Sequence, residues 1–209
     1  MLNDDVRKVK ESIIDNATKV DNGGFVGLPW YLIFPRLGEF IPVIPKATQM
    51  MFTAGSGIGK SHSWVGMILF SHYKLKKLFP NNGYKVKFLI TLLEDPKDMF
   101  ISRLFCMIFY DKYGIRVDVL TLKSMRKVKL SQEIQDKLDD IEAEIIDLLV
   151  DCEIIDSTYN PTGIFKWVRS ESNKLGTHHN KIMKFSKDDG TTYNQEVYSH
   201  YTATDPDLQ

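Results

Sequence analysis

The sequence predicts an α/β domain whose mostly parallel sheet is flanked by helices. Three observations predict it. Short apolar segments alternate with longer segments of helical period. A glycine-rich loop joins the first strand-like segment to the first long helical one. The chain has 209 residues, 43% of them hydrophobic, which is enough to bury one core. Parallel strands linked through helices should have right-handed crossovers.

The N-terminal part of the chain is predicted to be a helix and linker, 1–24, ahead of the main domain, 25–209. Apolar residues in 4–20 recur at steps of three and four, which is typical of a helix with one apolar face. That face could pack on this chain's own core or dock on a neighbouring subunit. Four prolines between 25 and 45 exclude a long regular element there and leave a short helical turn near 33–40.

The remaining elements follow from apolar runs and the turn residues that bound them. Strands are expected at 48–53, 84–93 and 153–156. Helices are expected at 60–79, 95–112, 131–149 and 160–174, with an extended or helical piece at 117–122. The polar segment after 177 is expected to hold a hairpin within 184–193, turning at an Asp-Gly step, and to fray from 203 onward.

The glycine-rich loop carries the strongest functional signal. Residues 54–61 read Ala-Gly-Ser-Gly-Ile-Gly-Lys-Ser, the P-loop pattern with alanine in the first glycine position. We expect main-chain N–H groups at a helix N-terminus to enclose the phosphates of a nucleoside triphosphate, most simply ATP with Mg²⁺. Lys60 would contact the β- and γ-phosphate oxygens, and the Ser61 hydroxyl would bind Mg²⁺. The predicted nucleotide-binding residues are Ala54, Gly55, Ser56, Gly57, Ile58, Gly59, Lys60, Ser61 and His62.

Glu94 is a candidate catalytic base because it directly follows the strand expected at 88–93. At the carboxyl end of a strand beside the P-loop strand, its carboxylate could face the γ-phosphate and activate a water molecule. The alternative is an exposed glutamate at a strand end. Asp95 is better interpreted as a helix cap than as a catalytic group.

Several of these segments together resemble the hexameric replicative helicases of the DnaB type, phage-encoded members among them. They are Gly27-Leu28-Pro29, the loop 54–61, the strand and turn 88–96, and Arg103-Leu104. The resemblance spans about 25–180 and is strongest over 48–105. It implies a RecA-like P-loop NTPase fold, ATP-driven translocation on single-stranded DNA and a ring of six subunits. It also implies that Glu94 and Lys60 are catalytic and that Ser61 binds the metal.

The chain departs from that family where a Walker B aspartate should end a further apolar strand. Residues 145–151 include several aliphatic residues and end in aspartate, as a Walker B strand would. Their apolar spacing, however, continues the helix expected from 131. Asp156 ends a better strand, although in the family that strand precedes the Walker B strand by tens of residues. We therefore expect either the first half of a motor domain, truncated before the Walker B strand, or a diverged relative with an incomplete C-terminal half.

Composition excludes some functions and leaves others open. Lys+Arg and Asp+Glu both number 27, so net charge gives no global case for nucleic-acid or membrane binding. No apolar run is long enough to span a bilayer and the first residues are unlike a signal peptide, so we expect a cytoplasmic protein, in the host cytoplasm if phage-encoded. Basic clusters at 74–77 and 123–129 are better interpreted as solvated faces than as phosphate contacts.

Two other functional classes remain as alternatives to the helicase motor. One is a non-motor P-loop protein that binds ATP as an accessory factor of replication or recombination. The other is a P-loop kinase acting on a small molecule, which the six scattered arginines disfavour, because a kinase lid is rich in arginine.

Overall fold

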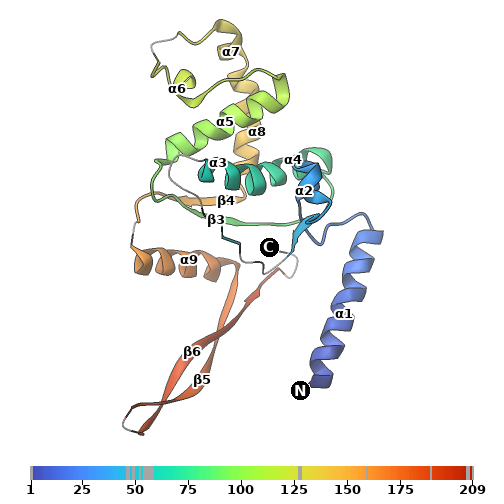
Figure 1. Cartoon of the computed structure of the whole chain (residues 1–209), viewed down its shortest axis with the longest axis vertical. Helices are drawn as coiled ribbons and strands as arrows, with labels where there is room; N and C mark the ends of the chain where they lie inside the picture. The colour runs from blue at the N-terminus through green and yellow to red at the C-terminus, as the bar shows by residue number, and fades with distance from the viewer. Residues whose placement is uncertain are drawn as a thin grey trace. The chain divides into compact units, whose positions relative to one another are not determined.

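The computed structural model describes residues 2–45, 48, 50–51, 53, 59–126, 129–158, 160–188, 190–205 and 208. Its elements divide between two units (Figure 1). Unit 1 comprises Met1–Tyr84 and Asp98–Asp151, and unit 2 comprises Lys85–Lys97 and Cys152–Gln209. The two units interleave along the chain. The domain boundary that the sequence predicts after residue 24 stays a prediction.

The N-terminal part of unit 1 follows the sequence closely. Helix α1 (Leu2–Asp21) confirms the helix expected at 4–20. The proline-rich stretch then forms only short elements, as expected: β1 (Gly27–Pro29), η1 (Trp30–Leu32), α2 (Pro35–Gly38) and β2 (Val43–Pro45). Strands β1 and β2 pair antiparallel, with Leu28 opposite Ile44. A Cβ atom on Gly27 would lie 2.3 Å from the Ile44 carbonyl oxygen, so this close approach requires glycine.

One continuous helical stretch follows the glycine-rich loop, which confirms the helix expected at 60–79. It consists of α3 (Lys60–Trp64), the π-helical segment η2 (Val65–Phe70) and α4 (Ser71–Leu78). The π segment was not predicted, because apolar spacing does not separate it from an α-helix.

Four more helices follow in the described part of unit 1: α5 (Lys97–Tyr113, of which Lys97 belongs to unit 2), α6 (Val119–Leu122), α7 (Gln132–Asp136) and α8 (Leu138–Leu149). The helix expected at 131–149 is interrupted at Lys137, and Ser131 caps its start by accepting a hydrogen bond from the Ile134 N–H. Residues 145–149 are helical, so this segment is a helix end and no Walker B strand. The core consists of fully buried apolar side chains: Val65, Leu69, Leu75, Phe100, Leu104, Ile108, Phe109, Ile141, Ile145 and Leu148.

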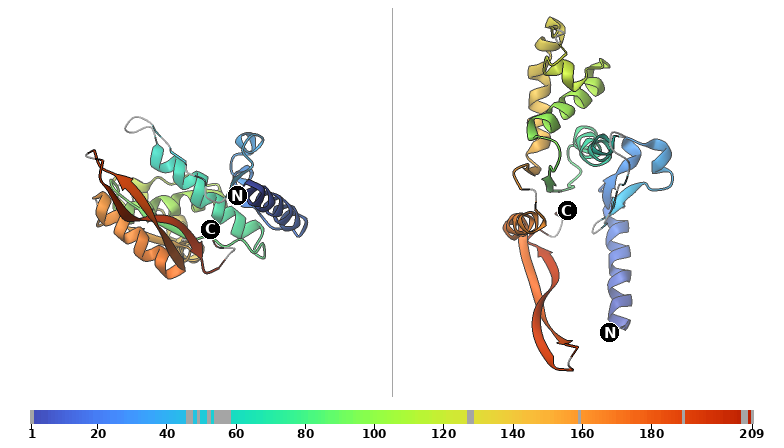
Figure 2. Two further views of the ribbon diagram at one scale, coloured as in Figure 1. Left: turned by 90° about the horizontal axis from the view of Figure 1, so that it is seen from below. Right: turned by 60° about the vertical axis from the view of Figure 1, so that its left-hand side comes forward.

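Unit 2 contains a parallel strand pair, a helix and a long ribbon. Strand β3 (Phe88–Thr91) pairs parallel with β4 (Cys152–Ile155), so that Ile90 lies opposite Ile154. Helix α9 (Pro161–Leu175) begins as predicted, because the Asn160 side chain accepts a hydrogen bond from the Gly163 N–H at 2.7 Å. Strands β5 (Gly176–Ser186) and β6 (Thr192–Ala203) then form a twisted antiparallel ribbon (Figure 2).

The hairpin expected within 184–193 is therefore only the tip of that ribbon. The strands contain eleven and twelve residues and form eleven pairs, which reach Gly176 opposite Ala203. Local turn chemistry marks the tip, where Gly190 adopts a φ of +79°. The strands behind it are mostly polar, and their few apolar residues do not alternate regularly, so the pattern by which half-buried strands are recognised is absent.

The described residues contain three two-stranded sheets: β1–β2, β3–β4 and β5–β6. Of these, β3–β4 is parallel. In the strand expected at 48–53, the described positions 48, 50, 51 and 53 are not in a strand, and the others lie outside the described residues. The RecA-like fold with its mostly parallel sheet therefore stays a prediction. No described helix has the length and apolarity needed to cross a membrane.

Candidate nucleotide-binding site

The glycine-rich loop enters the described part of the chain at Gly59, since residues 54–58 lie outside it. Gly59 adopts a left-handed conformation, φ +93° and ψ 22°, directly before the first helical residue, Lys60. A residue with a Cβ atom would be strained in this conformation, which explains why glycine occupies the position. The Gly59 carbonyl oxygen accepts the Ser63 N–H at 2.9 Å and the Ser63 hydroxyl at 3.1 Å. The helix thus begins at Lys60, as the P-loop pattern predicts.

The three described candidate side chains are consecutive on the first turn of α3. Lys60 and His62 are exposed, and Ser61 is half-buried. The first turn of a helix presents main-chain N–H groups without intrahelical acceptors, at the positive end of the helix dipole. The turn therefore combines N–H donors, an accessible ammonium group and a hydroxyl oxygen, a set that suits a phosphate with a hard cation such as Mg²⁺.

The core of unit 1 holds this helical stretch in place. The Trp64 ring stacks on the buried Phe100 of α5 with ring centroids 5.8 Å apart. Val65 and Leu69 in the π segment are buried, and Gly66 lies close to Phe34 and Met107. Short π-helical segments are frequent at functional sites, where the extra residue per turn shifts which side chains share a face.

The far end of the same stretch is tied to α8 by charged groups. His72 is only 2% exposed, and its Nε2 lies 2.8 Å from Asp151 Oδ2. Lys76 Nζ lies 3.1 Å from the same carboxylate and 2.9 Å from Asp147 Oδ2. Burial lowers the pKa of His72, against the opposing effect of Asp151. Burial alone would raise the pKa of Asp151, but hydrogen bonds from His72 and Lys76 outweigh it and lower that pKa.

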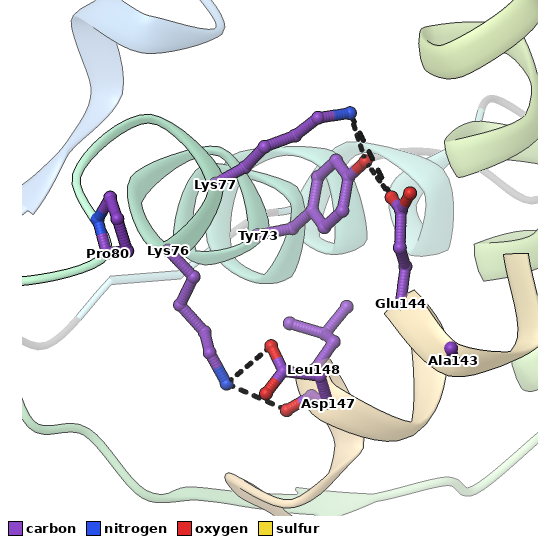
Figure 3. A pocket seen from close by; sticks show the side chains of 8 residues that line it. All are labelled: Tyr73, Lys76, Lys77, Pro80, Ala143, Glu144, Asp147 and Leu148. Carbon is purple, nitrogen blue, oxygen red and sulfur yellow. Dashed lines mark hydrogen bonds and ion pairs between the residues drawn. The ribbon is translucent and has the colours of Figure 1, made fainter. Parts of the chain in front are cut away.

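A second group of polar and charged side chains links α4 to α8 and to α5, next to the His72 contacts. Figure 3 shows its members from α4 and α8. The Tyr73 hydroxyl lies 2.5 Å from Glu144 Oε2 and 2.9 Å from Lys77 Nζ. Lys112 Nζ lies 2.8 Å from Glu144 Oε1. Burial, reinforced by Glu144, raises the pKa of Tyr73. These groups border a cavity of about 560 Å³, whose lining residues are Tyr73, Lys76, Lys77, Pro80, Ala143, Glu144, Asp147 and Leu148.

Both basic clusters of the sequence are engaged in ion pairs within unit 1. Lys74 contacts Asp111, Lys123 contacts Asp98, and Arg126 Nε lies 3.4 Å from Asp118. With the carboxylates of α8, these groups offset the charge of Lys74, Lys76, Lys77, Lys123 and Arg126 without a nucleic acid. The ion pairs favour the interpretation of these clusters as part of the protein's own surface.

Glu94 and Asp156 follow the two parallel strands of unit 2. Glu94 is exposed, on a bend after β3. The carboxyl ends of β3 and β4 lie at one edge, since the strands are parallel and the Leu92 N–H donates to the Ile155 carbonyl at 2.8 Å. Ligands of open α/β sheets bind at such an edge.

Asp156 has a local structural role that the sequence did not reveal. Its Oδ2 accepts the N–H of Lys97, the first residue of α5, at 3.1 Å. Asp156 thus supplies a capping hydrogen bond of the kind expected from Asp95. The partner is 59 residues away in the chain, so local sequence gave no signal of it.

The structure brings the described candidates together only in part. Lys60, Ser61 and His62 share one helical turn of unit 1, whereas Glu94 belongs to unit 2. Among the described residues, no group of three or more His, Cys, Asp or Glu side chains could hold a metal ion. The His72–Asp151 and Tyr73–Glu144 contacts were missed, although His72 and Lys76 are four residues apart and so share a helix face.

Comparisons with protein families, curated proteins and solved structures found no match to this chain. The resemblance to DnaB-type helicases therefore rests on its sequence motifs.

Proposed function

We propose that this chain binds ATP with Mg²⁺ through the P-loop 54–61 and acts as a motor unit of the DnaB type on single-stranded DNA. The observation that supports nucleotide binding best is the left-handed Gly59 followed at once by a helix from Lys60. A P-loop needs this arrangement, because it directs the first-turn N–H groups and the positive end of the helix dipole at the phosphates.

Each residue of the proposed site has a distinct role. Main-chain N–H groups from Ala54 to His62 enclose the phosphates, and the Lys60 ammonium neutralises charge on the β- and γ-phosphate oxygens. The Ser61 hydroxyl is one ligand of Mg²⁺, which commonly takes one or two protein oxygens together with phosphate oxygens and water. Bound Mg²⁺ supplies charge neutralisation at the phosphates. The family resemblance adds Glu94 as the base that activates water.

Titration with a fluorescent ATP analogue, with and without Mg²⁺, tests the nucleotide site. Lys60→Ala should weaken binding at least about tenfold, since a charge-assisted contact contributes about 1.5–3 kcal/mol. Ser61→Ala should weaken binding mainly when Mg²⁺ is present. Ser63→Ala, two residues along the same helix, is the matched control and should leave the Mg²⁺ effect in place. Unchanged affinity in Lys60→Ala would refute the proposed site.

Steady-state ATP hydrolysis distinguishes a motor from a passive binder. A motor should hydrolyse ATP faster when single-stranded DNA is added, and Glu94→Gln should abolish turnover while retaining ATP binding. Asp95→Asn, the neighbouring carboxylate, is the control and should keep turnover. ATP binding without DNA stimulation, and with no separate effect of Glu94→Gln, would favour the accessory-factor alternative.

A further inference from the structure

Helix α1 carries a row of apolar side chains that unit 1 leaves exposed to solvent. The members of this row are between 53% and 63% exposed: Val6, Val9, Ile13, Ile14 and Val20. Residue 4 and residues 6–21 of α1 are all exposed, so this face makes no buried contact in unit 1. An exposed apolar stripe along a 20-residue helix indicates an interaction surface.

The spacing of this stripe identifies its partner as another helix of the same kind. Positions 6, 9, 13, 16 and 20 follow each other at steps of three, four, three and four, which is the a/d pattern of a coiled coil. The a positions are Val6, Ile13 and Val20, apolar β-branched residues that suit the a layers of a coiled coil. Val9 and Asn16 occupy d positions, and Ile14 falls outside the seam.

We propose that α1 pairs with α1 of a second copy of this chain as a parallel, in-register, two-stranded coiled coil. In a parallel pair, residues at the same position face each other, so the Asn16 amide meets its counterpart and can hydrogen-bond to it. An antiparallel pair would place Asn16 against Val6 of the second copy and leave a polar group without a partner in the seam. The parallel arrangement is therefore favoured. The seam spans about three heptads, so we expect reversible pairing.

This interface does not depend on the proposed nucleotide site, and sedimentation velocity of the full chain without nucleotide tests it. The wild type should show a reversible monomer–dimer equilibrium over a concentration series. Ile13→Asp, in the seam, should raise the dimer dissociation constant at least about tenfold. Ile14→Asp makes the same change one residue outside the seam. It should lower helix propensity by a similar amount and leave the dimer dissociation constant within about twofold.

Three outcomes would overturn the pairing: a wild type that stays monomeric at every concentration, equal effects of Ile13→Asp and Ile14→Asp, or an assembly that neither substitution changes. Lys60→Ala should keep the dimer whatever it does to ATP binding. A failure of the interface is therefore distinguishable from a failure of the nucleotide site.

Thiol oxidation tests the orientation. Val9→Cys should form a disulfide with its own counterpart in a parallel pair, whereas Glu11→Cys, on the outer face of the helix, should not. The wild type, oxidised in parallel, measures any contribution of the free thiols of Cys106 and Cys152. A disulfide that forms between Val9→Cys and Ile13→Cys chains, but not within Val9→Cys alone, would show antiparallel pairing and overturn the parallel arrangement.

Discussion

In unit 1, the apolar faces of α4, α5 and α8 lose nearly all contact with solvent, whereas in the β5–β6 ribbon of unit 2 no residue of either strand is buried. Ile108 in α5 is 0% exposed and Ile182 in β5 is 74% exposed, although the two side chains are chemically identical. Stability of unit 1 rests on burial, while the ribbon depends on its ladder of main-chain hydrogen bonds and on cross-strand pairs such as His179 and His200.

The buried core of unit 1 positions the candidate site, whereas the β5–β6 ribbon leaves its side chains available for contacts. The helical stretch from Lys60 to Leu78 is anchored by Trp64 against Phe100 near its start and by His72 against Asp151 further along. The ribbon contacts α9 near its base, where the Tyr201 hydroxyl donates to the Ser172 carbonyl at 2.9 Å and the Ser172 hydroxyl lies 2.7 Å from His178 Nε2. Local opening should therefore begin in the ribbon.

The largest expected effect comes from the matched isoleucines. Ile108→Ala should lower the free energy of unfolding by about 2–5 kcal/mol, because it removes buried methyl groups and leaves a cavity. Ile182→Ala makes the same chemical change on an exposed strand and should stay within about 0.5 kcal/mol. Urea denaturation followed by circular dichroism measures both. Similar losses in the two variants would contradict the comparison.

A smaller effect should appear as a pH dependence of unit 1. Burial lowers the pKa of His72 below 6.5, so the unfolded chain binds the proton more readily than the folded chain. Stability should be complete above pH 6.5 and fall as the pH drops from 6.5 through the folded pKa. The groups facing His72 are Asp151, Lys76 and Asp147, and the lowered pKa of Asp151 adds a loss of the same sign below pH 3.8.

Thermal unfolding between about pH 8 and about pH 5 measures this dependence. His72→Gln should remove the part of the decline that begins near pH 6.5. His62→Gln, an exposed histidine on the same helical stretch, is the control and should keep the decline. A profile that is the same in all three proteins would show that His72 does not couple protonation to folding.

The smallest expected effect comes from the helix caps of the two units. Asn160→Ala should destabilise α9 by about 1 kcal/mol, because the Gly163 N–H loses its acceptor. Ser131→Ala removes the equivalent cap of α7 in unit 1, where the hydrogen bond is longer, at 3.4 Å. Hydrogen exchange measured by mass spectrometry should increase locally in each variant. Faster exchange of α5 in Asn160→Ala would show that the units do not open separately.

Much of the secondary structure could be predicted because its causes are local. Ser131 and Asn160 mark helix starts through their own side chains, and the prolines between 25 and 45 break up any long element there. The β5–β6 ribbon could be predicted only at its tip. Its length is set by pairing between residues up to 27 positions apart, Gly176 and Ala203, and polar strands carry no apolar alternation.

The candidate site shows the same division. The P-loop pattern and the left-handed glycine before Lys60 follow from the sequence, because backbone sterics favour glycine wherever φ is positive. The roles of His72 and Asp156 do not, since their partners are 79 and 59 residues away. Sequence alone thus determined where helices start, where turns occur and which loop carries a phosphate-binding pattern. Tertiary structure decided which carboxylates serve folding and which apolar faces stay in solvent, because burial and ion pairing depend on segments that meet only after the chain has folded.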